Sequence, residues 1–177
     1  SLIFFPDMLL PLSLAEEYGE NKIEAGKNQL TSTKTKAVNG QAQMQEQTSA
    51  ISNMFGSAWP EEAWKHYTQT AQQAYTPLIS LQIQQQMYGG EEDSAISDAS
   101  SRAEQECEQA RTEFMEVWVP IIDGMNQQID GAIAMLEPAM DDYETQIAAL
   151  NARKEQVNAL SEQLPILAEE TGKVNAV

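Results

Sequence analysis

The feature that most constrains the fold of this chain is a heptad-spaced apolar stripe towards its carboxyl end. Steps that alternate between four and three residues, from Leu136 to Leu164, meet apolar side chains at seven of nine positions. These positions are Leu136, Met140, Tyr143, Ile147, Leu150, Lys154, Val157, Ser161 and Leu164. A narrow stripe of this kind is typical of a coiled coil or a long antiparallel helix pair. Because a helix cannot bury its own stripe, another helix must cover it.

The composition favours helices and disfavours anionic partners. Glutamine is plentiful and β-branched residues are sparse in the 177-residue chain, which favours helix over sheet. The net charge is −17, and most of the acidic excess lies after residue 60. Such acidity argues against nucleic acid or an anionic membrane surface as an electrostatic partner. It permits a basic protein partner, although solubility alone also accounts for it.

No combination of residues predicts a reaction, a cofactor or a metal. The single cysteine, Cys107, excludes an internal disulfide and lies among glutamates that should raise its pKa. The single histidine, His66, has no second histidine or nearby cysteine with which to bind zinc or form a triad. A di-iron carboxylate site needs Glu-x-x-His twice, which one histidine cannot supply. We therefore expect a protein that is not an enzyme and binds no cofactor or metal.

The chain is expected to form one all-α domain over residues 1–177. Ser13-Leu14-Ala15-Glu16 has capping-box spacing and predicts a first long helix over residues 13–54. Residues 59–88 form a shorter aromatic-rich helix, residues 89–96 a Gly-Gly acidic loop, and residues 97–164 a long kinked helix. The C-terminal tail, residues 165–177, should fray, with Gly172 as a stop. This predicts an elongated antiparallel helical bundle or coiled-coil hairpin, with the shorter helix between two long arms.

The first long helix has two heptad columns on its buried side. One column contains Ile23, Leu30, Ala37, Met44 and Ile51. The other contains Gly19, Gly26 and Gly40, and glycine costs a helix about 1 kcal/mol each. We interpret these small residues as a face of the first helix that allows close packing against the helix that carries the apolar stripe from Leu136 to Leu164. A weak, partly frayed helix is the alternative interpretation.

The apolar residues 1–14 provide the candidate interaction surface. The segment is too short to span a bilayer and is interrupted by Pro6 and Pro11. It either tucks against the helical core or forms a surface for self-assembly, a chaperone or a membrane. Two tryptophans are added as candidates, although their spacing also fits a core. The candidates are Leu2, Ile3, Phe4, Phe5, Met8, Leu9, Leu10, Trp59 and Trp64.

The order of these segments resembles the type III secretion filament proteins of the EspA and SseB kind. The similarity lies in the order of three segments and in their pattern of apolar and polar residues. The segments are Leu2–Leu14, then Asn21-Lys22-Ile23-Glu24 with Lys27-Asn28, then Tyr143–Val177. The prolines in the apolar segment depart from the family pattern. The resemblance implies an extracellular, bacterial filament or translocon subunit that a secretion chaperone keeps soluble before export.

A second resemblance is to the WXG100/LXG proteins exported by type VII secretion. Met54-Phe55-Gly56 at a predicted bend resembles their Leu-x-Gly motif, and Ala63-Trp64-Lys65-His66-Tyr67 is similar to the residues that follow it. Met replaces Leu, and Pro-Glu follows Trp59 where the family has x-Gly. This resemblance implies a targeting module for a secreted toxin or its helper.

The sequence therefore predicts a secreted or cell-surface helical protein that acts by self-assembly or by binding a protein partner. An α-helical pore-forming toxin component, which would insert residues 1–14 into a membrane, is the competing function class.

Overall fold

A computed structural model describes the backbone of residues 20–89 and 93–177 and the side chains of residues 31–89 and 94–177. The elements are α1 (Glu20–Phe55), η2 (Gly56–Ala58), α2 (Glu61–Tyr88), α3 (Asp93–Leu136), η3 (Glu137–Ala139) and α4 (Glu144–Asn175). The described residues form no strand. The expectation of an all-α chain whose helices pack against one another is confirmed.

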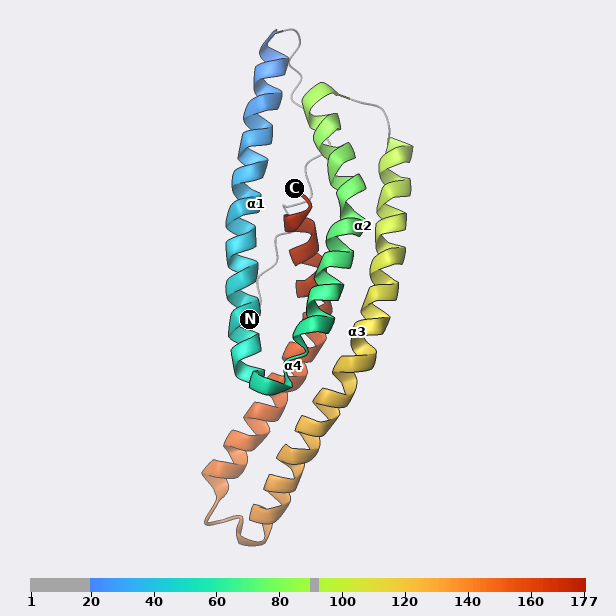
Figure 1. The fold of residues 1–177 in the computed structure, drawn as a ribbon. Coiled ribbons are helices and arrows are strands. Elements are labelled where there is room, and N and C mark those ends of the chain that lie inside the picture. The colour runs from blue at the N-terminus through green and yellow to red at the C-terminus, as the bar shows by residue number, and fades with distance from the viewer. Residues whose placement is uncertain (1–19, 90–92) are drawn as a thin grey trace.

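The four long helices are arranged around α2 and α4. Each of these two helices packs against the other three, whereas α1 and α3 lie on opposite sides and make no extended contact among the described residues (Figure 1). Beyond the turn between α1 and α2, α3 and α4 continue together as a two-helix projection. We call this projection, residues 122–157, the α3–α4 arm.

The core of the bundle lies where α4 is enclosed by the other helices. Leu164, Leu167, Ala168 and Val174 of α4 are fully buried. In α1 the first heptad column places Ala37, Met44 and Ile51 in the core. Thr33, seven residues after Gly26 in the glycine column, is also buried. The large, fully buried side chains that α2 and α3 contribute to the core are Tyr67, Ile79, Phe114 and Trp118.

An aromatic cluster joins the end of α1 to α2 and α3 at the base of the arm. Trp118 contacts Phe55 edge-on at 5.0 Å between ring centroids and stacks on Phe114 at 6.0 Å. Trp59 adds a tilted contact with Trp64 at 5.2 Å and an edge contact with Trp118 at 6.0 Å. Aromatic pairs at these distances add about 0.5–1.5 kcal/mol each beyond the area that they bury. The cluster therefore fixes the position at which the arm leaves the bundle.

Glycines with positive φ end the first two helices. Gly56 has φ 58° immediately after α1, and Gly89 has φ 67° immediately after α2. Residues with a Cβ rarely adopt this conformation, so glycine allows the chain to leave the helix without strain. The Gly89 N–H also donates to the Gln85 carbonyl at 2.9 Å and completes the last turn of α2.

The structure differs from the single kinked helix expected over residues 97–164. Helical structure begins four residues earlier, at Asp93, and ends at Leu136, after which the chain reverses through residues 137–143. Pro138 lies in the first turn of η3, and successive three-residue turns follow, including Met140 N to Glu137 O at 3.1 Å. Leu136, Met140 and Tyr143 are therefore not on the helix of Ile147 and Leu164. The heptad spacing crosses a turn whose side chains are exposed.

The carboxyl-terminal residues also differ from the expected fraying tail. The last helix continues through Pro165 to Asn175, and Val174 is fully buried. Gly172 is not a stop: a Cβ built there would lie 2.5 Å from the Ala71 Cβ and 2.7 Å from the Gln72 backbone nitrogen. Glycine at this position lets α4 approach the backbone of α2 closely. The start expected at Ser13 and the residues at 1–14 lie outside the described part of the chain.

Candidate functional site

A partly buried ionic network ties the second half of α4 to α2 and α3. The Arg111 guanidinium donates to both carboxylate oxygens of Glu169, with Nη2 at 2.8 Å from each. The Tyr67 hydroxyl donates to Glu169 Oε2 at 2.8 Å. Burial raises the pKa of Tyr67 above its usual range, and the Glu169 carboxylate raises it further. Tyr67 is fully buried and the Glu169 side chain is only 15 % exposed, whereas Arg111 is 42 % exposed. The carboxylate is thus enclosed by its two donors, and the network acts as a structural clamp.

The thiol of Cys107 lies close to this network and is protected. The side chain is fully buried. Burial first, and the nearby Glu169 carboxylate second, raise the pKa of Cys107 to about 11. The sequence predicted the direction of this shift from neighbouring glutamates, but burial is the larger cause. A thiol that stays protonated at neutral pH is a poor nucleophile.

His66 lies on the surface in an isolated pair. Its Nε2 is 3.3 Å from Glu113 Oε2, and both side chains are more than half exposed. Over the described residues, His, Cys, Asp and Glu side chains form no group of three or more suited to holding a metal ion.

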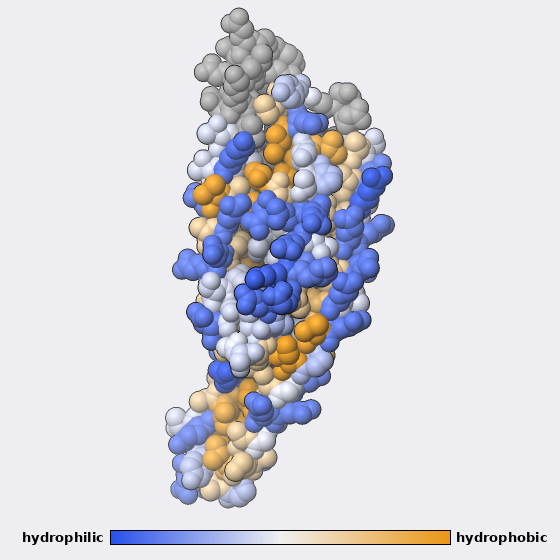
Figure 2. All heavy atoms as spheres, viewed as in Figure 1, coloured by the Kyte–Doolittle hydropathy of each residue, from blue (hydrophilic) through white to orange (hydrophobic). Residues whose placement is uncertain are grey.

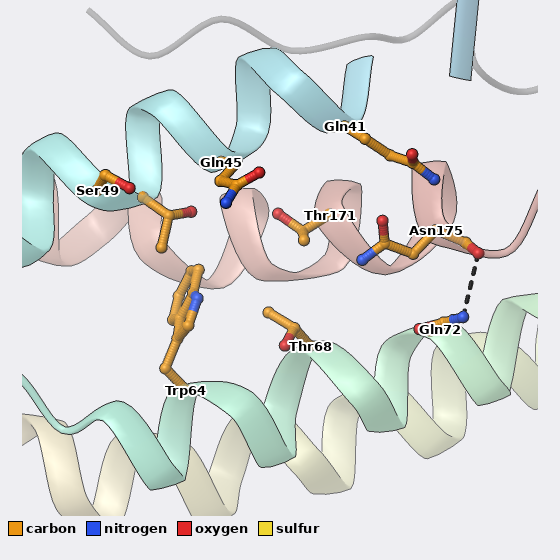
Figure 3. A pocket seen from close by; sticks show the side chains of 9 residues that line it. Gln41, Gln45, Ser49, Trp64, Thr68, Gln72, Thr171 and Asn175 are labelled. Carbon is orange, nitrogen blue, oxygen red and sulfur yellow. Dashed lines mark hydrogen bonds between the residues drawn. The ribbon is translucent and has the colours of Figure 1, made fainter. Parts of the chain in front are cut away.

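A polar pocket opens between α1, α2 and the last turns of α4. Its volume is about 500 Å³. Every lining side chain can form a hydrogen bond, and none is charged. The lining consists of Gln41, Gln45, Thr48, Ser49, Trp64, Thr68, Gln72, Thr171 and Asn175 (Figure 3).

Two glutamines hold α4 at one end of the polar pocket. Gln41 of α1 donates through Nε2 to the Val174 carbonyl at 3.2 Å. From the opposite side, Gln72 of α2 donates to the Asn175 carbonyl at 3.1 Å (Figure 3). Each side-chain amide uses one of its two N–H groups in this way and retains the other N–H and the carbonyl oxygen.

Three exposed apolar side chains lie together at the tip of the α3–α4 arm, and one of them, Met135, is the most exposed large apolar side chain of the described residues. We call residues 132–147 the arm tip. Met135 is 83 % exposed, Met140 53 % and Tyr143 39 %. Ile133 and Leu136 are only partly buried, since no third helix reaches them. Figure 2 shows apolar residues exposed among polar ones over this lower part of the molecule.

Cross-helix hydrogen bonds fix the pairing of α3 and α4 along the arm. Trp118 Nε1 donates to Ser161 Oγ at 2.8 Å at its base. Further out, Asn126 Nδ2 donates to Asn158 Oδ1 at 3.0 Å. Lys154 Nζ reaches Asp130 Oδ1 at 2.7 Å. The arm tip therefore projects from a pairing with a defined register.

Of the interaction-surface residues expected from the sequence, the structure describes only Trp59 and Trp64. Trp64 is 5 % exposed and Trp59 is partly buried, because both belong to the aromatic cluster. Trp64 lies in the core and also lines the polar pocket, and Trp59 packs against the core. The candidates Leu2, Ile3, Phe4, Phe5, Met8, Leu9 and Leu10 lie outside the described residues.

Sequence reasoning missed both the arm tip and the polar pocket. The dense run Glu137, Pro138, Asp141 and Asp142 could have indicated a turn inside the apparent stripe. For the pocket, Gln41, Gln45, Thr48 and Ser49 share one face of the first helix. That polar face gives no sign of the α2 and α4 residues that complete the pocket.

Comparisons with protein-family models, with curated proteins and with solved structures found no match to this chain. None of the helices in the described ranges combines the length and the apolar character that crossing a bilayer requires.

Proposed function

We propose that this protein is a non-catalytic, elongated antiparallel helical bundle that binds a protein partner through the arm tip. The observation that carries the proposal is the exposure of Met135, Met140 and Tyr143 at the end of a two-helix arm whose helices are joined by side-chain hydrogen bonds. Exposed apolar residues gathered at one place mark interaction sites, whereas scattered ones do not. Methionine adapts its shape to a partner surface, and tyrosine is enriched at interface centres.

The charge at the arm tip selects the chemistry of the partner. Glu137, Asp141, Asp142 and Glu144 are exposed beside the apolar side chains. Residues 131–152 contain no lysine, arginine or histidine. Two identical tips would bring like charges together, and an anionic membrane would repel them. A groove with an apolar floor and a basic rim complements this surface.

Secretion or export, at a bacterial surface or outside the cell, is the setting that we propose for this binding. Its support is the resemblance of segment order to type III secretion filament proteins, with WXG100/LXG proteins as the alternative. Both groups act through helical protein–protein contacts, with themselves or with a chaperone. A projecting arm with exposed apolar side chains at its tip suits a protein that acts by binding other proteins.

A peptide-display selection against the chain, from a library of random peptides, tests the proposed partner chemistry. We expect enriched peptides to combine lysine or arginine with large apolar residues. Their binding should fall at least about tenfold in a Met135→Ser, Met140→Ser double variant, an effect of the size expected for interface anchors. Binding should also weaken as salt is raised, because exposed charge pairs are screened.

The matched control for this experiment is Val38→Ser. Val38 is 61 % exposed on α1, far along the chain from the arm tip. This variant should bind the selected peptides as the parent protein does. Peptides that bind the double variant as tightly as the parent, or that bind equally well at high salt, would contradict the proposal. Light scattering over a wide concentration range tests assembly separately, and growth in mass would favour a second copy as the partner.

A further inference from the structure

We infer that the polar pocket is a binding site for a neutral, hydroxyl-rich ligand of the saccharide class. It lies between α1, α2 and the last turns of α4. These turns are at the opposite end of α4 from the arm tip (Figure 1). The inference is therefore independent of the function proposed for the tip.

The first observation is the absence of charge in a strongly acidic protein. Among 177 residues with a net charge of −17, the nine that line the pocket carry none. A phosphate or carboxylate ligand is favoured by cationic side chains, and a bound cation by carboxylates, and the lining has neither. An apolar ligand would leave the amides and hydroxyls of the lining without partners, which costs free energy for each group. A neutral polar ligand is the class that remains.

The second observation is an unused donor inside the pocket. Trp64 is 5 % exposed, and its indole N–H donates to no protein atom in the described part of the chain. Figure 3 shows the indole extending from α2 into the space beneath α1. In contrast, the indole N–H of Trp118 donates to Ser161 Oγ at 2.8 Å. Tryptophan N–H groups usually find a partner when the ring is buried. The Trp64 N–H is not among the buried atoms without a partner, so solvent reaches it, and a ligand acceptor in the pocket would take the place of water.

The third observation is the balance of donors and acceptors. Gln41 and Gln72 each use one of their two amide N–H groups on α4 and retain the other N–H and the carbonyl oxygen. Gln45, Thr48 and Ser49 on α1 can both donate and accept. A sugar hydroxyl also both donates and accepts, and neighbouring hydroxyls match the paired donor and acceptor of a side-chain amide.

The size and shape of the pocket favour a saccharide over a peptide. A volume of about 500 Å³ falls in the range that holds small ligands, roughly 300–1,000 Å³. A bound peptide would need apolar hollows for its side chains, and here the edge of Trp64 is the one aromatic surface in the lining. A short neutral oligosaccharide needs no such hollow.

Titration of the full chain with neutral trisaccharides, followed by ¹H–¹⁵N correlation spectra, tests this inference. The probes are maltotriose, cellotriose and tri-N-acetylchitotriose. We expect the Trp64 indole N–H signal, identified by its loss in Trp64→Phe, to shift with at least one of them. The Trp118 indole signal should stay in place, because its N–H already has a partner.

Variants on α1 separate specific binding from general effects of sugar. The change Gln45→Ala together with Thr48→Val alters side chains at the rim of the pocket and leaves the core intact. Apparent affinity should fall at least about fivefold, as loss of one or two hydrogen bonds predicts. Gln73→Ala is the matched control, because Gln73 is an exposed glutamine on α2 outside the pocket. It should leave the titration unchanged.

Two results would overturn the inference. One is no shift of the Trp64 signal with any of the three sugars at about 10 mM, a concentration that reveals even millimolar affinities. The other is a shift produced by the neutral peptide Gly-Ser-Gly-Asn-Gly but by none of the sugars, which would assign the pocket to a peptide.

Discussion

Gly172 is a single residue on which the packing of α4 against α2 depends. A methyl group at this position would meet the Ala71 side chain and the backbone of α2 at 2.5–2.7 Å. Backbone cannot move aside as a flexible side chain can, so we expect Gly172→Ala to lower the free energy of unfolding by about 1–3 kcal/mol. Urea denaturation followed by circular dichroism measures the effect.

Gly131→Ala is the matched control for this substitution. Gly131 is also helical, and a Cβ there has no neighbour within 4 Å. Alanine is the better helix former by about 1 kcal/mol, so this variant should be equally or more stable than the parent. Equal effects of the two substitutions would show that α4 does not approach α2 as closely as described.

The buried titratable groups make the fold sensitive to alkaline pH. The pKa of Cys107 rises from 9.0 to about 11 in the folded chain, and the pKa values of Tyr67 and Tyr75 also rise. Above about pH 9 the unfolded chain loses these protons while the folded chain retains them, so the free energy of unfolding decreases as pH increases. We expect the urea midpoint to hold below pH 9 and to fall progressively towards pH 11.

Replacing the thiol tests the share of this effect that belongs to Cys107. Cys107→Ala should reduce the loss of stability between about pH 9 and pH 11, since one of the groups with a raised pKa is then absent. A urea midpoint that rises over this interval in the parent protein would contradict the assignment.

At the scale of elements, α4 depends on one ionic clamp. Glu169 is 15 % exposed and accepts hydrogen bonds from both Arg111 and Tyr67. Its removal leaves a guanidinium and a hydroxyl without partners. We expect Glu169→Ala to lower the free energy of unfolding by about 2 kcal/mol, allowing for the partial exposure of Arg111. Thermal or urea unfolding measures this loss.

Glu113→Ala provides the comparison on the same helix bundle. Glu113 also pairs with a side chain on another helix, His66, but both groups are more than half exposed. The free energy of unfolding should change by less than about 0.5 kcal/mol. A loss as large as that from Glu169→Ala would indicate that burial does not distinguish the two pairs.

The elements could be predicted from the sequence wherever the helical period and the breaking residues agree. The glycines at 56 and 89 end helices as their positions indicate, and the column Ala37, Met44 and Ile51 is buried. The reversal after Leu136 could not be predicted from period alone, because Met140 and Tyr143 continue the heptad by coincidence while lying exposed in a turn. Pro165 lies within a helix and Pro138 in a turn, so proline did not distinguish the two cases.

The candidate sites were less predictable than the elements, because they depend on contacts between distant segments. Trp64 has the spacing of a core residue and is buried, but its edge reaches the polar pocket only because α4 returns beside α2. No local pattern places Asn175 next to Gln72, about a hundred residues earlier. The arm tip could be predicted only by locating the reversal of the chain, and the heptad spacing of apolar residues continues across that turn without a sign of it.

At the scale of the whole molecule, the bundle and the arm should differ in local stability. The bundle buries α4 among three helices, whereas the arm tip is covered by one partner helix. Segments with few buried apolar contacts open more readily than core segments. We expect backbone amides in residues 130–150 to exchange hydrogen for deuterium faster than those in residues 64–79 and 164–172, as measured by mass spectrometry. Uniform protection along α3 and α4 would contradict this division.

The position of α4 has a consequence for how the protein is made. Synthesis delivers α1, α2 and α3 before α4, yet Leu164, Leu167 and Ala168 of α4 fill the space that those three helices share. Until α4 has been synthesised, the three helices that precede it keep an apolar face that they cannot fill themselves, so their packing is completed only when α4 docks.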